Sequence, residues 1–401
     1  MAEGAQKAGV LAHEEALELF RRGKDVWNAW AEDEANYGRD VDFSNHNFSV
    51  APAKFAGFVF PGPVNFTNCI FGHADFTDAH FRGGDAIFDG AMFNEGIAKF
   101  TRAQFSGGIA IFADAQFSGG HTWFAKAKFS GGTVMFDGAK FTGGNASFEE
   151  AEFSGGDVRF LGTVFSKEAM FSEAKFKHVA TFAMADFGSA VYLNGTVFSR
   201  VPDFRFTKLA AHFTLHGVQI QYRDGRERAS WLGLTWAKAG HDSDADKFRR
   251  LKELAITAKD HDREQAFFAG ELKAKRFYET TGAALAWSYM YEWFSDFGRS
   301  SKRPLVALVS TWLVFGGGYW LTATFLPVVD PSKSFLEGLR LSAAVLVPFS
   351  AAARLSFEEA RTHLYGTVGG FWLDTFAFGE GILGLAFVFL IGLALRNRFR
   401  I

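Results

Sequence analysis

Residues 98–124 read AKFTRAQFSGGIAIFADAQFSGGHTWF, and the fold is decided by the spacing within this stretch. A phenylalanine returns after five residues and then after seven, twice over, at Phe100, Phe105, Phe112, Phe117 and Phe124. The residue two places before each ring is small, being alanine at four of these five sites and Thr122 at the last. A large and a small residue at fixed spacing, with variable polar residues between them, indicate an internal repeat.

The same pattern continues on both sides, over about residues 55–213. Between Phe76 and Phe187 there are twenty such phenylalanines, and sixteen of them have Ala two places earlier. One large and one small inward residue on each side can fill a narrow tube. In such a tube every strand pairs with the coils before and after it, so that only the two ends are edges. The repeat therefore predicts a β-solenoid.

With its small inward residue, its central Phe and the polar residues between them, this stretch resembles the pentapeptide-repeat family. The resemblance implies a right-handed quadrilateral β-helix with four five-residue sides per coil and phenylalanines stacked in ladders. Some members of the family imitate DNA and bind topoisomerase. Between Phe66 and Phe206 there are 15 acidic and 12 basic residues, a field that is too weak to favour this function here.

The alternating spacing of five and seven departs from the simple family pattern. The two extra residues are Gly-Gly at 83–84, 107–108, 119–120, 131–132, 143–144 and 155–156. Glycine tolerates positive φ and suits a bulged corner. We therefore predict a coil of about 24 residues, with the glycine pairs on two opposite corners. At this offset Phe76, Phe100, Phe124 and Phe148 form one core ladder.

Residues 1–54 are expected to form a helical cap and the first repeats. Apolar residues at helical spacing run from Ala12 to Trp30, and Gly23 is expected to divide them between two short helices. Because a bare solenoid end exposes apolar rings and unpaired strand groups, we expect Trp27 and Trp30 to cover it. A ligand-binding Trp pair is the alternative.

Residues 214–298 are expected to form a helical connector. Two apolar stripes at helical spacing, beginning at Phe248 and at Phe267, predict a helix pair. The segment 283–297 is rich in Trp and Tyr, residues that concentrate at membrane interfaces. It is therefore predicted to be an interfacial helix that leads into a bilayer.

Residues 299–401 are expected to form a two-span membrane domain. Leu305–Leu326 is free of charge and long enough to cross a bilayer, and a second span runs from Phe371 or Gly379 to Leu395. Basic residues flank the outer end of each span, at Arg299, Lys302, Arg303, Arg396, Arg398 and Arg400. The positive-inside rule then places both termini and the solenoid in the cytoplasm. The polar segment 1–20 lacks an apolar core, so we expect no cleaved signal peptide.

Between the spans, the apolar segment Phe335–Leu355 is too short to cross and is expected to be re-entrant or to lie on the surface. This layout is similar to the pore unit of two-transmembrane ion channels, although no Thr-Val-Gly-Tyr-Gly-like filter is present. Candidate pore or membrane-polar positions are Pro348, Phe349, Ser350, Asp374 and Glu380. The two acids are expected to face a pore or polar cavity together, or to be interfacial if the second span starts later.

Segments 295–304 and 392–401 resemble the corresponding parts of membrane-attached bacterial pentapeptide-repeat proteins, which implies a bacterial inner-membrane location. The net charge of −2 does not suggest nucleic acid as a partner. The single Cys69 is expected to be a small core residue, and His212 and His216 lack a third metal ligand. No nucleophile–base set or phosphate loop is evident, so we expect no enzyme activity and no cofactor.

Two functional hypotheses follow. The first is a homo-oligomeric, ion-channel-like protein of the lipid bilayer, with the β-helix as a cytoplasmic sensor or docking rod. The second is a membrane-tethered scaffold without transport activity, which binds a cytoplasmic protein on the β-helix faces.

Overall fold

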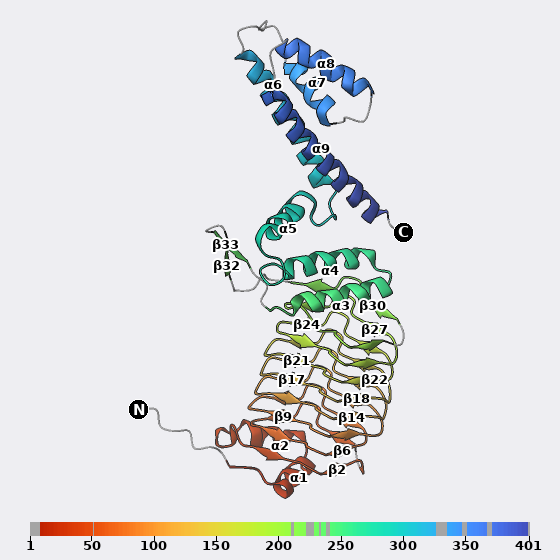
Figure 1. The fold of residues 1–401 in the computed structure, drawn as a ribbon. Coiled ribbons are helices and arrows are strands. Elements are labelled where there is room, and N and C mark those ends of the chain that lie inside the picture. Colours follow the sequence, from red (N-terminus) through yellow and green to blue (C-terminus); the bar gives the residue numbers. More distant parts are fainter. Residues whose placement is uncertain are drawn as a thin grey trace, which may run out of the picture. The chain divides into compact units, whose positions relative to one another are not determined.

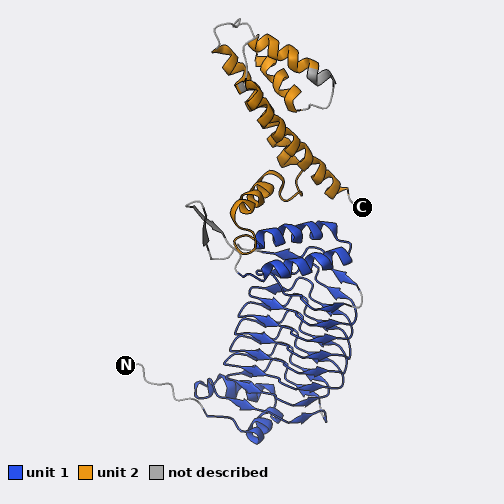
Figure 2. Cartoon of the chain, in the orientation of Figure 1, with its two compact units in different colours: residues 1–275 blue, residues 276–401 orange. Residues whose placement is uncertain are grey.

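A computed structural model describes residues 9–50, 52–209, 212–221, 228–231, 234–237, 241–325, 335–346, 351–366 and 371–399 (Figure 1). The chain forms two compact units, residues 1–275 and 276–401 (Figure 2). The segment 214–298, expected to be one connector, is therefore divided between the two units.

Unit 1 is a β-solenoid of about eight coils, as the repeat predicts. Four parallel sheets run along it, one with seven strands and three with eight, and each strand pairs with the equivalent strand of the next coil. Each strand of these four sheets is two residues long, and in most of them one side chain is buried in the core and the other faces outward. The strands begin at Val41 and end at Ile220, so the first repeats lie before residue 55 and the last strands lie past residue 213.

The first sheet comprises β1 (Val41–Asp42), β5 (Val64–Asn65), β9 (Ala86–Ile87), β13 (Ala110–Ile111), β17 (Val134–Met135), β21 (Val158–Arg159) and β25 (Ala180–Thr181). The second comprises β2 (Asn47–Phe48), β6 (Ile70–Phe71), β10 (Met92–Phe93), β14 (Gln116–Phe117), β18 (Lys140–Phe141), β22 (Val164–Phe165), β26 (Asp186–Phe187) and β29 (Lys208–Leu209). The third comprises β3 (Ala53–Lys54), β7 (Ala74–Asp75), β11 (Ala98–Lys99), β15 (Thr122–Trp123), β19 (Ala146–Ser147), β23 (Ala169–Met170), β27 (Val191–Tyr192) and β30 (Phe213–Thr214). The fourth comprises β4 (Val59–Phe60), β8 (His80–Phe81), β12 (Gln104–Phe105), β16 (Lys128–Phe129), β20 (Glu152–Phe153), β24 (Lys175–Phe176), β28 (Val197–Phe198) and β31 (Gln219–Ile220).

The predicted 24-residue offset is confirmed in the middle of the solenoid. Ala98 pairs with Ala74 and with Thr122, and Thr122 pairs with Ala146. The glycine pairs lie at two opposite corners, between the fourth and first sheets and between the second and third sheets. Near the two ends the coils are shorter, as the pairing of Ala53 with Ala74 and of Val158 with Ala180 shows.

The core of the solenoid consists of stacked rings and small residues. Phe76 stacks on Phe100 with ring centroids 4.9 Å apart, Phe100 on Phe124 at 4.6 Å, and Phe124 on Phe148 at 5.1 Å. Neighbouring ladders meet edge to face, for example Phe112 and Phe124 at 5.2 Å. Offset-stacked and edge-to-face contacts are both favourable arrangements of aromatic rings. The repeat therefore produces a continuous aromatic core.

The first coil is covered by α1 (His13–Arg21), α2 (Lys24–Glu32) and the 3-10 turn η1 (Glu34–Asn36). Gly23, at φ +89°, separates the two helices, as expected. Trp27 is fully buried over the rings, and its indole N–H donates to Val59 O at 2.8 Å. Trp30 is half-buried beside it, with ring centroids 5.3 Å apart. The cap thus supplies both an apolar cover and hydrogen-bond partners.

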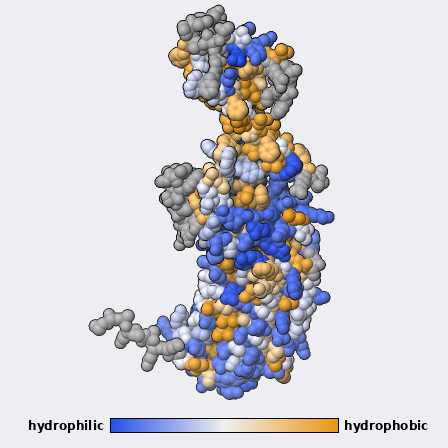
Figure 3. Space-filling model, viewed as in Figure 1, coloured by the Kyte–Doolittle hydropathy of each residue, from blue (hydrophilic) through white to orange (hydrophobic). Residues whose placement is uncertain are grey.

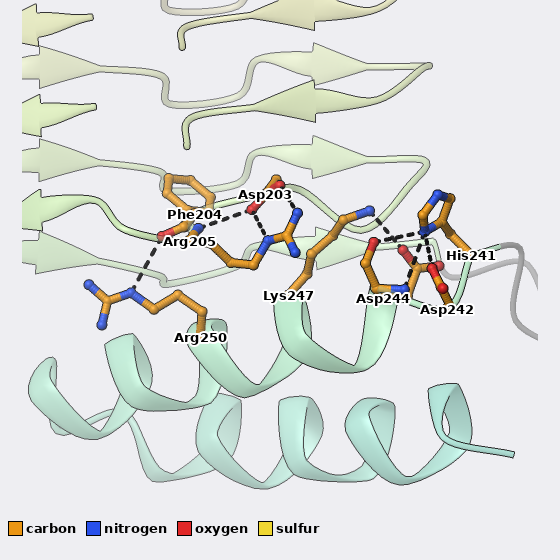
Figure 4. A network of polar contacts seen from close by, with 9 residues as sticks. Asp203, Phe204, Arg205, His241, Asp242, Asp244, Lys247 and Arg250 are labelled. Atoms are coloured by element: carbon orange, nitrogen blue, oxygen red, sulfur yellow. Dashed lines mark hydrogen bonds and ion pairs between the residues drawn. The ribbon is translucent and has the colours of Figure 1, made fainter. Parts of the chain in front are cut away.

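The last coil of unit 1 is covered by the helices α3 (Asp244–Thr257) and α4 (His261–Ala274). These helices confirm the helix pair that the two apolar stripes predict. Figure 4 shows Arg250 of α3 reaching the backbone of this coil, where it donates to Phe204 O at 3.4 Å. The same guanidinium donates to Thr207 O at 3.0 Å. Unit 1 also contains an antiparallel strand pair, β32 (Arg228–Trp231) and β33 (Leu234–Ala237). The sequence did not predict this pair.

Unit 2 contains five helices in its described residues: α5 (Gly282–Ser295), α6 (Lys302–Thr324), α7 (Phe335–Leu346), α8 (Ala351–Tyr365) and α9 (Phe371–Arg398). Helices α6 and α9 are long and apolar enough to cross a membrane. Helix α9 starts at the earlier of the two expected positions, Phe371. The segment 335–355, expected to be re-entrant or to lie on the surface, contributes to α7 and to the start of α8. Of these, α7 packs against both α6 and α9.

Candidate functional site

The interior of unit 2 contains one fully buried acidic side chain among the described residues, Glu380 of α9. The Tyr319 hydroxyl of α6 donates to Glu380 Oε2 at 2.8 Å. The Ser342 hydroxyl of α7 lies within hydrogen-bond distance of Glu380 Oε1. Three helices therefore place one polar group each at the same point.

Glycines allow these three helices to approach closely. A Cβ atom on Gly338 of α7 would lie 2.2 Å from Gly316 O of α6, and one on Gly384 of α9 would lie 2.7 Å from Leu346 Cδ2. Such separations are too short for any larger residue without a shift of the backbone or side chain. Small residues at Gly316 and Gly338 thus permit the close approach of α6 and α7. This approach brings Tyr319 and Ser342 within reach of the carboxyl group.

Further hydrogen bonds surround the carboxyl group and its two partners. The Trp312 indole N–H donates to Leu339 O at 2.9 Å, and Ser342 Oγ lies 3.1 Å from Trp312 O. The Tyr365 hydroxyl of α8 donates to Tyr319 O at 2.8 Å. Because these bonds join α6, α7 and α8, the partners of Glu380 are held in place by packing and by hydrogen bonds.

The rest of the bundle interior is apolar. Its buried core includes Tyr319, Ala323, Leu341, Ala360, Leu364, Tyr365 and Leu373. Within the described residues, no ion pair involves Glu380. A carboxyl group in such surroundings is costly to ionise, because no cation replaces the lost hydration.

The two acids of α9 do not share one environment. Glu380 is fully buried, whereas the Asp374 side chain is 59% exposed and lies 3.8 Å from Arg361 of α8. Within the chain, Glu380 occupies a polar position inside the bundle and Asp374 does not; that either acid faces a pore stays a prediction. The other candidates, Pro348, Phe349 and Ser350, lie outside the described residues.

Sequence reasoning identified Glu380 but missed its partners, Tyr319 and Ser342. Their signal in the sequence is weak, since α6 carries several other hydroxyl residues, among them Ser310, Thr311 and Thr322, and nothing distinguishes Tyr319 or Ser342 as a partner of an acid. Pairing them with Glu380 requires the packing of α7 between α6 and α9, which the sequence did not show.

The solenoid offers no comparable site among its described residues. Cys69 is buried in its core, where its thiol contacts Phe43 O at 3.0 Å, and burial raises the pKa of this thiol to about 12. Cys69 is therefore an unreactive core residue. Across the described part of the chain, no group of three His, Cys, Asp or Glu residues is arranged to hold a metal ion.

Comparison with protein families supports the architecture of unit 1. Residues 64–95 match the model of the family described as pentapeptide repeats, with eight copies. The solenoid is built from pentapeptide repeats. A comparison with curated proteins gave no match. The matched residues lie within the solenoid and outside the helical unit.

Proposed function

We propose that this chain is an integral protein of the bacterial inner membrane that forms a homo-oligomer and conducts ions. Its repeat solenoid would serve as a cytoplasmic sensor or docking rod. The observation that carries the proposal is Glu380, an acidic residue fully buried within an apolar helix bundle. Ionisable residues inside membrane segments are costly, and they commonly mark ion pathways.

The surface of unit 2 supports insertion into a bilayer. Large apolar side chains are exposed along α6 and α9, including Leu305, Val309, Val314, Phe376, Ile382 and Phe389. On the face shown in Figure 3, hydrophobic residues gather over this part of the unit. Water is a poor solvent for so much apolar surface. Lipid and further copies of the chain are the occupants that we propose for it.

The distribution of charge supports one orientation. Arg299, Lys302 and Arg303 precede or begin α6, and Arg396 and Arg398 end α9. The two ends lie close together, because the Asn397 amide donates to Gly298 O at 3.3 Å. Under the positive-inside rule this end faces the cytoplasm, as would the solenoid that precedes it in the chain. Trp287 and Trp293 of α5 are exposed, as suits tryptophans at the membrane–water interface on this side of the bilayer.

The proposal is tested with the purified full chain in liposomes that carry dyes for K⁺, Na⁺ and H⁺. We expect ion flux from the natural sequence and at least a tenfold change in flux for Glu380→Gln. Asp374→Asn is the matched control, because it neutralises the exposed acid of the same helix, and its flux should equal that of the natural protein. If none of the three ions crosses under any applied gradient, conduction is overturned and the scaffold hypothesis is favoured.

A further inference from the structure

We propose that Glu380 holds a proton within the bundle, so that the ion bound by unit 2 is H⁺, shared between Glu380 and Ser342. The claim that this proton is also conducted rests on the proposed function. The claim that the site binds it rests on the geometry alone.

Hydrogen-bond donors around Glu380 are too few for its charged form. Ser342 has one hydroxyl proton but two acceptors within reach, Glu380 Oε1 and Trp312 O. An ionised carboxylate only accepts, so with Glu380 charged, Ser342 can satisfy one of these two contacts and not both. A neutral Glu380 donates its own proton to Ser342 Oγ, and Ser342 then donates to Trp312 O. The Tyr319 hydroxyl donates to Glu380 Oε2 in either case. The neutral form thus accounts for all three contacts.

The charged groups near Glu380 also favour its neutral form. On α6, the titratable group that faces Glu380 is Tyr319, whose hydroxyl already donates to it. On α7, Glu337 and Arg340 pair with each other at 3.0 Å. On the remaining neighbours, Arg361 of α8 lies near Asp374 of α9, the Tyr365 hydroxyl donates to Tyr319 O, and Glu292 of α5 pairs with Arg276. Among the described residues no cation forms an ion pair with Glu380, and a buried, unbalanced charge is resolved most cheaply by binding a proton.

A consequence for the bundle follows from the same contacts. The proton joins α9 to α7 through Ser342, and Ser342 joins α7 to α6 through Trp312 O. Loss of the proton removes one of these links and leaves a negative charge among apolar side chains. Proton occupancy is therefore coupled to the packing of three helices, two of which are the candidate membrane spans.

Infrared spectroscopy of the full chain in liposomes tests the inference, because a neutral carboxylic acid shows a C=O stretch at higher frequency than either carboxylate band. At neutral pH, the spectrum of the natural protein minus that of Glu380→Gln should contain this acid band. The acid band should be unchanged in Asp374→Asn, the other acid of α9. If the difference spectrum contains carboxylate bands instead, Glu380 is ionised and the inference is overturned.

A second variant keeps the test decisive if Glu380→Gln does not fold. Tyr319→Phe removes the donor to Glu380 Oε2, so the acid C=O band should move to higher frequency while the carboxylate bands stay in place. Movement of the carboxylate bands alone would show an ionised Glu380. The liposome assay separates the two proposals: an acid band without ion flux removes conduction and leaves the proton site, whereas ion flux with an ionised Glu380 does the opposite.

Discussion

Replacing Phe124 by Ala should loosen the middle of the solenoid. The ring is fully buried and stacks between Phe100 at 4.6 Å and Phe148 at 5.1 Å. It also meets Phe112 edge to face at 5.2 Å and Phe136 at 5.4 Å. Truncating a core Phe to Ala costs about 3–5 kcal/mol, and the loss of four ring contacts places this site near the upper end of that range.

The assay is amide hydrogen exchange of the full chain, measured by mass spectrometry on peptides that cover residues 98–153. Because about 1.4 kcal/mol corresponds to a tenfold change in an equilibrium constant, the opening of these strands should become at least about a thousandfold more favourable. Gln116→Ala is the control, since this exposed side chain points outward from β14, and surface substitutions stay within about 0.5 kcal/mol. An increase below about tenfold, or one equal to that of the control, would refute the idea that stacked rings hold the coils together.

Two further predictions concern a corner and the last coil of the solenoid. In Gly143→Ala, the new Cβ would lie 2.0 Å from Gly119 O of the coil before it, so the corner must open at a cost of about 1–3 kcal/mol. Amide hydrogen exchange in the strands on either side of this corner should become faster. If Thr142→Ala, a change at the neighbouring exposed residue, raises the exchange rate by the same amount, the prediction is wrong. The second prediction concerns Asp203, where burial opposes ionisation, but hydrogen bonds from Arg205 hold the pKa of this carboxyl below its ordinary value. Its stabilising effect should therefore be complete above about pH 4 and be lost as the pH falls through the lower folded pKa. Asp203→Asn should lower thermal stability at pH 7 by about 1–2 kcal/mol and by less at pH 3, whereas Asp186→Asn, in an exposed pair with Lys208, should change it little. A loss for Asp203→Asn that is the same at both pH values would rule out the charge as its cause.

The solenoid could be predicted in detail because its inward positions recur. The spacings of five and seven state the coil length directly, and a 24-residue offset follows from adding two of each. The cap residue Trp27 was also identifiable, since the end of a repeat must be covered by something apolar.

The site in unit 2 was much less accessible to sequence reasoning. Helix α9 is apolar nearly all round, and such a helix carries no periodic signal to show which face is buried. Glu380 and Asp374 are six residues apart, which places them about 240° apart around the helix at roughly 100° per residue. Nothing in the sequence says which of these two directions meets α7. The sequence therefore did not show that Glu380 is buried and Asp374 exposed.

The 24-residue coil also means that the length of the solenoid can change only by whole coils. Each coil adds one strand to every sheet, and neighbouring strands lie about 4.8 Å apart, so the length along the sheets changes in steps of that size. Removing residues 98–121 would join Ile97 to Thr122 and restore the same register, with both capped ends untouched. Gain or loss of whole coils can therefore change the length of such a solenoid while every phenylalanine ring keeps a stacking partner.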